Sequence, residues 1–174
     1  MKKIYILLMH TNTVPSRVVK FFTRYEYSHV AISLDKSCSK LYSFGRKNLH
    51  SVLDGGFSIE NKDGEFFKVF SKTICRIYEI KVTDKQYKSA QKLIHKMEKN
   101  KEEYKYDFFG VVIRYFKIPV TFKNKFVCSY FVAFVLQKAK IYNFNKDICL
   151  IKPKDFTKIE GMHQIYSGSY LAYV

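Results

Sequence analysis

The 174-residue sequence has few of the residues that mark several large classes of protein. It contains 7 Gly and 3 Pro, and no segment repeats at a fixed period, which excludes a collagen-like, low-complexity or repeat architecture. No apolar run approaches the roughly 18 residues of a membrane span, since the longest candidate, 126–136, is shorter and contains Ser129. With 47% hydrophobic residues the chain can instead bury one core, so we predict a single domain over residues 1–174.

The sequence also lacks the motifs of metal and nucleotide sites. Its four cysteines form no C-x-x-C pair, and its five histidines show no H-E-x-x-H spacing. Gly55-Gly56 belongs neither to a phosphate-binding loop nor to a dinucleotide-binding fingerprint. We therefore expect no metal and no cofactor. The apolar run 4–9 is too short for a signal peptide and is typical of a strand, so we expect a cytoplasmic protein with reduced thiols.

Acidic residues are scarce, because 15 Asp and Glu stand against 31 Lys and Arg, a formal net charge of +16. Such an excess favours an anionic partner, either nucleic acid or an acidic membrane surface. Only five of the cations are Arg, however, which is the residue that binds phosphates and bases in bidentate fashion. Lysines spread along the whole chain are typical of a solvated surface. We therefore expect no specific nucleic-acid partner and leave peripheral membrane contact open.

Hydropathy patterns divide the chain into a β-rich first half and a helical second half. Strands are predicted over 4–9, 28–34, 41–44, 66–70, 73–82 and 165–174, with a long glycine-marked connection from 45 to 56. Helices are predicted over 13–24, 84–100 behind a Thr83 capping box, 107–116 and 129–140. This order predicts an α+β fold with a mostly antiparallel sheet packed against helices.

Two residues carry the chemical interest. Strand alternation places His29 on one face with Ala31 and Ser33, whose small side chains leave room for an imidazole. Cys128 lies where an extended segment turns into a helix, and the unpaired N–H groups of a helix start favour a thiolate. An imidazole beside that thiol would complete a nucleophile. The plainer interpretation of His29 is a partly exposed histidine on a hairpin. The plainer interpretation of Cys128 is a small buried apolar residue.

The order of these segments resembles a known family. The segment 27–32, YSHVAI, followed much later by 126–132, FVCSYFV, is similar to the circularly permuted NlpC-like branch of the papain-like cysteine peptidases and amidases, which includes bacterial YiiX- and YaeF-type proteins. The hairpin strand 41–45 and Tyr106, Asp107 and Gly110 ahead of the cysteine extend the resemblance over nearly the whole chain. It implies a papain-like fold with the nucleophile at a helix N-terminus.

The resemblance implies a role for each matching residue. Cys128 would be the nucleophile of a thiol protease or amidase, with its N–H in the oxyanion hole, and His29 would be the general base. Tyr106 would line the substrate site. Ser43 corresponds to the third catalytic member, where relatives often carry Glu or His, and Glu60 is an alternative partner for the histidine. A hydroxyl orients an imidazole less well than a carboxylate does.

The leading hypothesis is a cysteine-dependent hydrolase that cleaves the amide bond of a small acyl or peptide substrate, attracted by the basic charge if it is anionic, through a thioester. Transfer of the acyl group to an amine or lipid hydroxyl, as in related lecithin:retinol acyltransferase-like proteins, would make it an acyltransferase instead. Two alternatives remain open. One is a non-enzymatic basic module that binds an anionic polymer or membrane, and the other is a scaffold of the same fold with an attenuated site.

Overall fold

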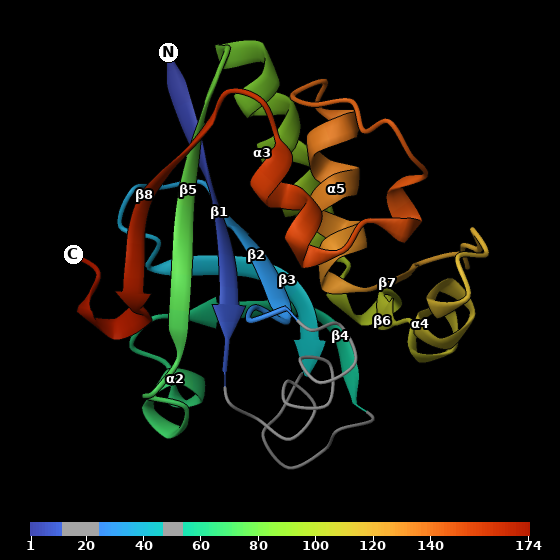
Figure 1. Cartoon of the computed structure of the whole chain (residues 1–174), viewed down its shortest axis with the longest axis horizontal. Coiled ribbons are helices and arrows are strands. Elements are labelled where there is room, and N and C mark those ends of the chain that lie inside the picture. Colours follow the sequence, from blue (N-terminus) through green and yellow to red (C-terminus); the bar gives the residue numbers. More distant parts are fainter. Residues whose placement is uncertain (12–24, 47–53) are drawn as a thin grey trace.

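The centre of the fold is a curled, mostly antiparallel sheet (Figure 1). The computed structural model describes residues 1–11, 25–46 and 54–174, and over these the sheet has eight strands in the order β7-β6-β4-β3-β2-β1-β5-β8. Each neighbouring pair is antiparallel except β6 and β7, which are parallel. The strands are β1 Lys2–His10, β2 His29–Ser33, β3 Lys40–Arg46, β4 Gly55–Asn61, β5 Ile74–Val82, β6 Lys105–Tyr106, β7 Lys125–Phe126 and β8 Met162–Ser169.

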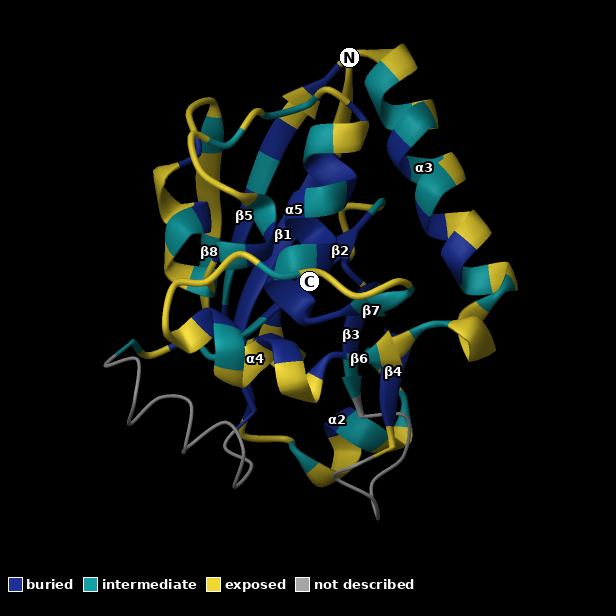
Figure 2. Cartoon of the chain, turned by 90° about the vertical axis from the view of Figure 1, so that its right-hand side faces the viewer, coloured by how far each residue is buried: buried dark blue, intermediate teal, exposed yellow. Residues whose placement is uncertain are grey.

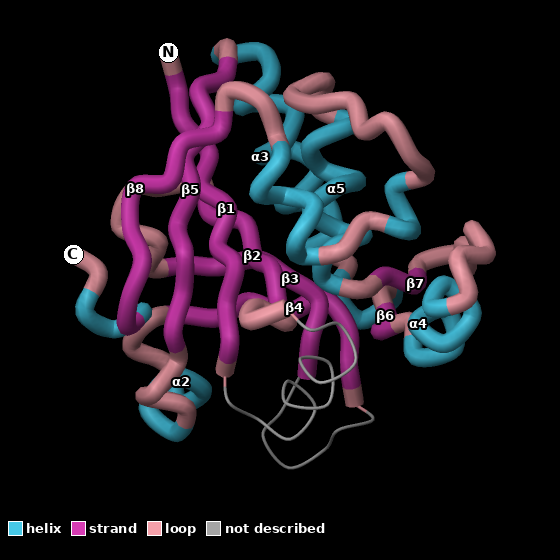
Figure 3. The backbone as a smooth tube through the Cα atoms, viewed as in Figure 1, coloured by secondary structure: helices cyan, strands magenta, loops and turns pink. Residues whose placement is uncertain are grey.

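Helices lie on both faces of this sheet, with the longer ones on one face (Figure 3). They are α2 Glu65–Val69, α3 Asp84–Lys99, α4 Phe108–Tyr115 and α5 Cys128–Lys138, with short 3-10 turns at Lys101–Glu103, Ile148–Leu150, Pro153–Lys158 and Tyr170–Ala172. Helices α3 and α5 pack on one face, where Val30, Ile32 and Phe44 meet the buried side of α5 in the larger core. On the other face, Phe67 of α2 and Tyr170 close a smaller core.

Local signals in the sequence account for most of these elements. Thr83 and Gln86 form the predicted capping box at the start of α3, and Asp107 caps α4 by accepting a hydrogen bond from the Gly110 N–H. The strands β1, β2, β3 and β5 are confirmed within one or two residues, as is the start of α5. An α+β fold with a mostly antiparallel sheet is therefore confirmed.

Two predicted elements are wrong, and one lies outside the described residues. The segment 66–70 is the helix α2 rather than a strand, because a single side chain, Phe67, reaches the core while Phe66 and Phe70 pack together one turn apart. Gly55-Gly56 begins strand β4 rather than a loop. The chain after β8 forms a 3-10 turn. The helix predicted over 13–24 falls outside the residues described.

Among the described residues, none of the helices combines the length and the apolar character that crossing a bilayer requires.

Candidate active site

The candidate site lies where strands β2 and β3 separate. In the described part of the chain, their register contains one pair, Ile32 opposite Tyr42. Nearer the start of β2, the Val30 carbonyl instead accepts a hydrogen bond from Ser43 Oγ at 2.7 Å. The N–H and C=O of an extended residue point to the same side, so the Val30 N–H is also directed toward β3. That N–H lowers the pKa of the Cys128 thiol, so the first turn of α5 lies next to strand β2 at this opening.

Helix α5 presents Cys128 as its first residue. Val127 is the N-cap in an extended conformation and provides no side-chain cap, so the first N–H groups of the helix remain directed at the region of the thiol. The neighbouring Ser129 anchors this turn, because its hydroxyl donates a 2.6 Å hydrogen bond to the carbonyl of Ile151. The nucleophile predicted from sequence thus stands at a fixed helix N-terminus.

The helix start favours a thiolate at Cys128, as the sequence predicts, but burial opposes it. Burial raises the pKa of the thiol above its ordinary value of 9.0. The backbone N–H groups of Val30, Ser129 and Cys128 itself lower the pKa, but they do not compensate for the lost hydration. The helix start therefore stabilises a thiolate that burial still disfavours, and the resting group is a neutral thiol.

His29 begins strand β2 and is also neutral at rest. Burial lowers the pKa of its imidazole to about 4. Its Nε2 atom lies 3.9 Å from Oε1 of Glu60 and has no hydrogen-bond partner among the described residues. A Cβ atom at Gly45 would lie 3.7 Å from His29 Cε1 and 3.8 Å from Glu60 Oε1. The missing side chain at Gly45 therefore leaves the space in which the imidazole and carboxyl group meet.

Glu60 of strand β4 is the polar partner of the histidine. Burial raises the pKa of its carboxyl group to about 7, although a 3.4 Å hydrogen bond from Ser58 Oγ to Oε1 opposes that shift. The charge of Glu60 also raises the pKa of Cys128, which shows that its field reaches the thiol. Glu60 thus lies beside His29, and its charge disfavours a thiolate at Cys128.

Ser43, which the resemblance implies as the third catalytic member, hydrogen-bonds to the backbone of strand β2. Its buried hydroxyl donates a hydrogen bond to the Val30 carbonyl. The group beside His29 Nε2 is the carboxyl of Glu60. The sequence predicts a connection at Gly55-Gly56 and so offers Glu60 only as an alternative partner. In the structure, Gly55 begins strand β4, which aligns Glu60 opposite Leu41 of β3.

Tyr106 lies close to the thiol, in the neighbourhood that the resemblance implies. It ends strand β6 and is paired with Phe126 of β7, two residues before Cys128. Burial, and after it the neighbouring Cys128, raise the pKa of the Tyr106 hydroxyl. A Cβ atom at Gly55 would come within 2.7 Å of the Tyr106 Cβ, so this glycine allows β4 to approach the tyrosine.

A buried ion pair holds the segment between Tyr106 and Cys128 in place. Asp107 lies 2.9 Å from Arg114 Nη1, and their side chains are 1% and 6% exposed. Arg114 also donates to the Val120 carbonyl at 2.9 Å, and the Asp107 N–H donates to the Phe126 carbonyl at 3.0 Å. A side chain at Gly110 would collide with both charged groups. These contacts join α4 to strand β7 and hence to the start of α5.

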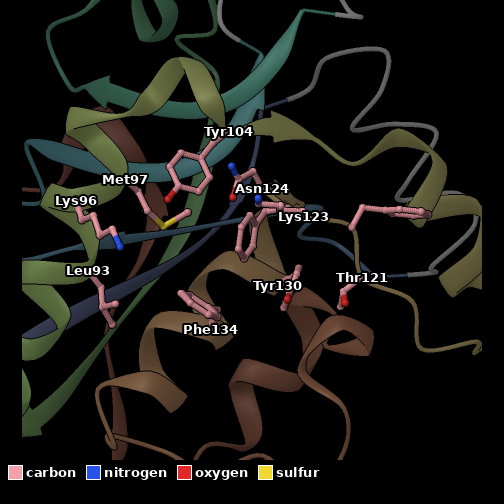
Figure 4. Close-up of a pocket in the computed structure, with 11 residues that line it drawn as sticks. Leu93, Lys96, Met97, Tyr104, Thr121, Lys123, Asn124, Tyr130 and Phe134 are labelled. Atoms are coloured by element: carbon pink, nitrogen blue, oxygen red, sulfur yellow. The ribbon is translucent and has the colours of Figure 1, made fainter.

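A separate pocket of about 330 Å³ opens between helices α3 and α5. Figure 4 shows Leu93 and Met97 on one side of it, Tyr130 and Phe134 on another, and the segment 121–124 at its rim. Cys128 and His29 are not among the described residues that line it. The pocket is therefore a neighbour of the candidate site and not the site itself.

The other cysteines contribute no further centre. Cys38, Cys75 and Cys149 are free and buried, and burial raises the pKa of Cys38 and Cys75 to about 12 and of Cys149 to about 11. In the ranges 1–11, 25–46 and 54–174, no group of three or more His, Cys, Asp and Glu is placed to hold a metal ion. In comparisons with known proteins, the chain matches no family model, no curated protein and no solved structure.

Proposed function

We propose that this chain is a cysteine-dependent hydrolase that cleaves an amide bond through a thioester, with Cys128 as nucleophile and His29 as base. One observation carries the proposal: Cys128, at the first turn of α5, lies close enough to the backbone N–H of Val30 for that group to lower the pKa of the thiol, and the preceding residue, His29, has its imidazole beside Glu60. The candidate nucleophile and the residue pair His29 and Glu60 therefore adjoin the same stretch of strand β2, where a general base and its orienting carboxyl group would be needed.

The resting charges support general-base attack rather than a preformed ion pair. His29 is neutral and accepts the thiol proton as the sulfur attacks the substrate carbonyl. The carbonyl oxygen of the substrate becomes negative and accepts a hydrogen bond from the backbone N–H of Cys128 at the helix start. Collapse of this intermediate breaks the C–N bond, the imidazolium protonates the departing amine, and a thioester remains on sulfur.

Water completes the cycle. His29 takes a proton from the water that attacks the thioester carbon, and the C–S bond then breaks to release the carboxylic acid and restore the thiol. Glu60 contributes when His29 is protonated, because an imidazolium beside a carboxyl group favours the ionised form of that carboxyl. A carboxylate at this position stabilises the imidazolium more than the hydroxyl of Ser43 could.

The arrangement supports the papain-like, circularly permuted assignment as part of the same proposal. The histidine strand β2 precedes the cysteine helix α5 in the chain, and the two elements pack together in the larger core. Tyr106 stands beside the thiol on the strand that pairs with the segment before the helix. These positions correspond to the roles that the resemblance implies for Cys128, His29 and Tyr106.

Acylation by p-nitrophenyl acetate tests the proposed chemistry. The full chain should release p-nitrophenolate and acquire one acetyl group on Cys128, located by peptide mass spectrometry. Cys128→Ala should acquire none, and His29→Gln should acylate at least about 100-fold more slowly. Cys149→Ala is the matched control, because it removes a buried thiol outside the site, and it should behave as the wild type.

Two results would overturn the proposal. One is acetylation of Cys128 at an unchanged rate in His29→Gln, and the other is acetylation confined to other residues in the folded protein. When an amine is added to the acylated protein, water and the amine compete for the acetyl group of the thioester. The ratio of acetate to acetamide products then distinguishes a hydrolase from an acyltransferase.

A further inference from the structure

Helix α4 and the segment after it expose a large apolar surface. We define the α4 surface as Phe109, Val112, Tyr115, Phe116, Ile118 and Phe122, all of which are exposed. Phe109 is 76% exposed and Phe116 is 69% exposed, values usually seen for polar side chains. Figure 2 shows exposed residues over much of α4, in contrast to the buried first turn of α5. Contiguous apolar surface of this kind marks an interaction site.

The α4 surface belongs to a firmly held element. Asp107 caps the helix, and Arg114 turns inward to the buried ion pair and to the Val120 carbonyl. The buried residues of the helix are Gly110 and Arg114, so its charged side chain faces the protein while its apolar side chains face outward. This reverses the usual arrangement of a surface helix, in which apolar residues face the core.

The charged side chains in the segment that follows the helix have one sign. No Asp or Glu occurs between Asp107 and Asp147, and Lys117, Lys123 and Lys125 follow the helix. The Lys125 ammonium lies 5.6 Å from the centre of the Phe122 ring, which places a cation directly beside the apolar surface. Long lysine side chains can rest their stems on apolar surface while their ammonium groups reach phosphates.

We propose that the α4 surface docks on a membrane leaflet that contains anionic lipid. The aromatic side chains would enter the boundary between headgroups and acyl chains, and the lysines would meet lipid phosphates and carboxylates. A second copy of the chain fits less well, because it brings the same lysines to the same surface and a net charge of +16. The inference stands on exposure and charge, and it does not depend on the proposed catalysis.

Vesicle flotation tests this docking. The full chain should float with vesicles of phosphatidylcholine containing about one third phosphatidylserine, and should bind pure phosphatidylcholine at least about tenfold more weakly. The double variant Phe109→Ser/Phe116→Ser should lose at least about tenfold in affinity for the anionic vesicles. Its matched control is Val69→Ser, which removes an exposed apolar side chain of α2 and should bind as the wild type does.

A charge series separates local docking from general attraction. Lys117→Gln/Lys123→Gln should weaken binding at least about threefold more than Lys88→Gln/Lys92→Gln, which removes the same charge from the exposed side of α3. Cys128→Ala should bind vesicles normally, so failure of docking and failure of catalysis are distinguishable. Equal losses in the two lysine pairs would overturn the proposal, as would unchanged binding of Phe109→Ser/Phe116→Ser.

The absence of tryptophan allows a direct measure of insertion. Phe116→Trp introduces a single indole on the α4 surface, and its emission should shift to shorter wavelength on anionic vesicles and be quenched by brominated lipid. Val69→Trp should show neither change. Absence of both changes in Phe116→Trp would contradict docking. A dimer in sedimentation that Phe109→Ser/Phe116→Ser dissociates, without vesicle binding, would assign the surface to a second copy.

Discussion

The Nε2 atom of His29 lies 3.9 Å from Oε1 of Glu60, and burial drives both groups toward their neutral forms. The pKa of the imidazole falls from 6.5 to about 4, while that of the carboxyl group rises from 4.5 to about 7. Between about pH 4 and pH 7 the site therefore holds a neutral imidazole beside a mostly protonated carboxyl group. When His29 accepts the proton of the Cys128 thiol, the resulting imidazolium lowers the pKa of the neighbouring Glu60 carboxyl group.

The opposite pKa shifts of His29 and Glu60 predict that the two residues make opposite contributions to the pH dependence of stability. The folded state binds fewer protons at His29 than the unfolded state does between pH about 4 and 6.5, so this residue makes stability rise with pH. It binds more protons at Glu60 between pH 4.5 and about 7, so that residue makes stability fall with pH. Over their shared window the two effects largely cancel in the wild type.

Urea unfolding from pH 4 to pH 8 should separate the two contributions. Relative to the wild type, Glu60→Gln should gain up to about 3 kcal/mol as pH rises through the window of Glu60. Relative to the wild type, His29→Asn should be more stable at pH 4 and should lose that advantage by pH 6.5. A constant difference across the range, in either variant, would contradict the neutral pair.

The raised pKa of the thiol predicts how the resting protein reacts with iodoacetamide. Cys128 should be alkylated before the other cysteines, because it is 8% exposed and Cys38, Cys75 and Cys149 are at most 2% exposed. The rate should rise with a midpoint above pH 9.0, and His29→Gln should leave that midpoint unchanged because the imidazole is already neutral there. A midpoint below pH 7, lost in His29→Gln, would instead indicate a resting ion pair.

Because Ser43 and Glu60 have different hydrogen-bond partners, we expect a variant of Ser43 to change stability and a variant of Glu60 to change the acylation rate. Ser43→Ala leaves the Val30 carbonyl without its donor, so it should lower the free energy of unfolding by about 1–3 kcal/mol with little change in the acylation rate. Glu60→Gln should slow acylation at least about tenfold and alter its pH profile.

Ser39→Ala, on the exposed turn between β2 and β3, is the control for Ser43→Ala and should change neither quantity. A loss of acylation in Ser43→Ala that matches the loss in Glu60→Gln, at equal stability, would restore Ser43 as the third catalytic member.

The buried pair of Asp107 and Arg114 predicts a strong coupling in a double-mutant cycle. Asp107→Asn or Arg114→Gln alone should cost about 3–5 kcal/mol, because each leaves a buried charge without its partner. The double variant should cost less than the sum of the two single variants. On the surface, Glu79→Gln removes the 2.8 Å contact with Lys3 and should cost less than about 1 kcal/mol. Additive losses in the buried pair would show that the two residues act independently.

Much of the local structure follows from the amino-acid sequence alone. The capping residues Thr83 and Asp107 set the starts of two helices, because a side chain that accepts from the first N–H groups acts over only three residues. The continuous apolar run of β1 and the apolar periodicity of α3 depend in the same way on near neighbours. The sequence therefore also determined that Cys128 stands at a helix start and His29 on a strand.

The tertiary structure alone decided how these residues are combined. The register of β3 and β4 brings Glu60 to His29 and leaves Ser43 to the Val30 carbonyl, and register depends on pairing between segments distant in the chain. Burial reversed the expected shift of the Cys128 pKa, because the free energy of hydration lost by a thiolate depends on everything packed around it. Likewise, the inward turn of Arg114 toward Asp107 decided that the apolar residues of α4 face outward.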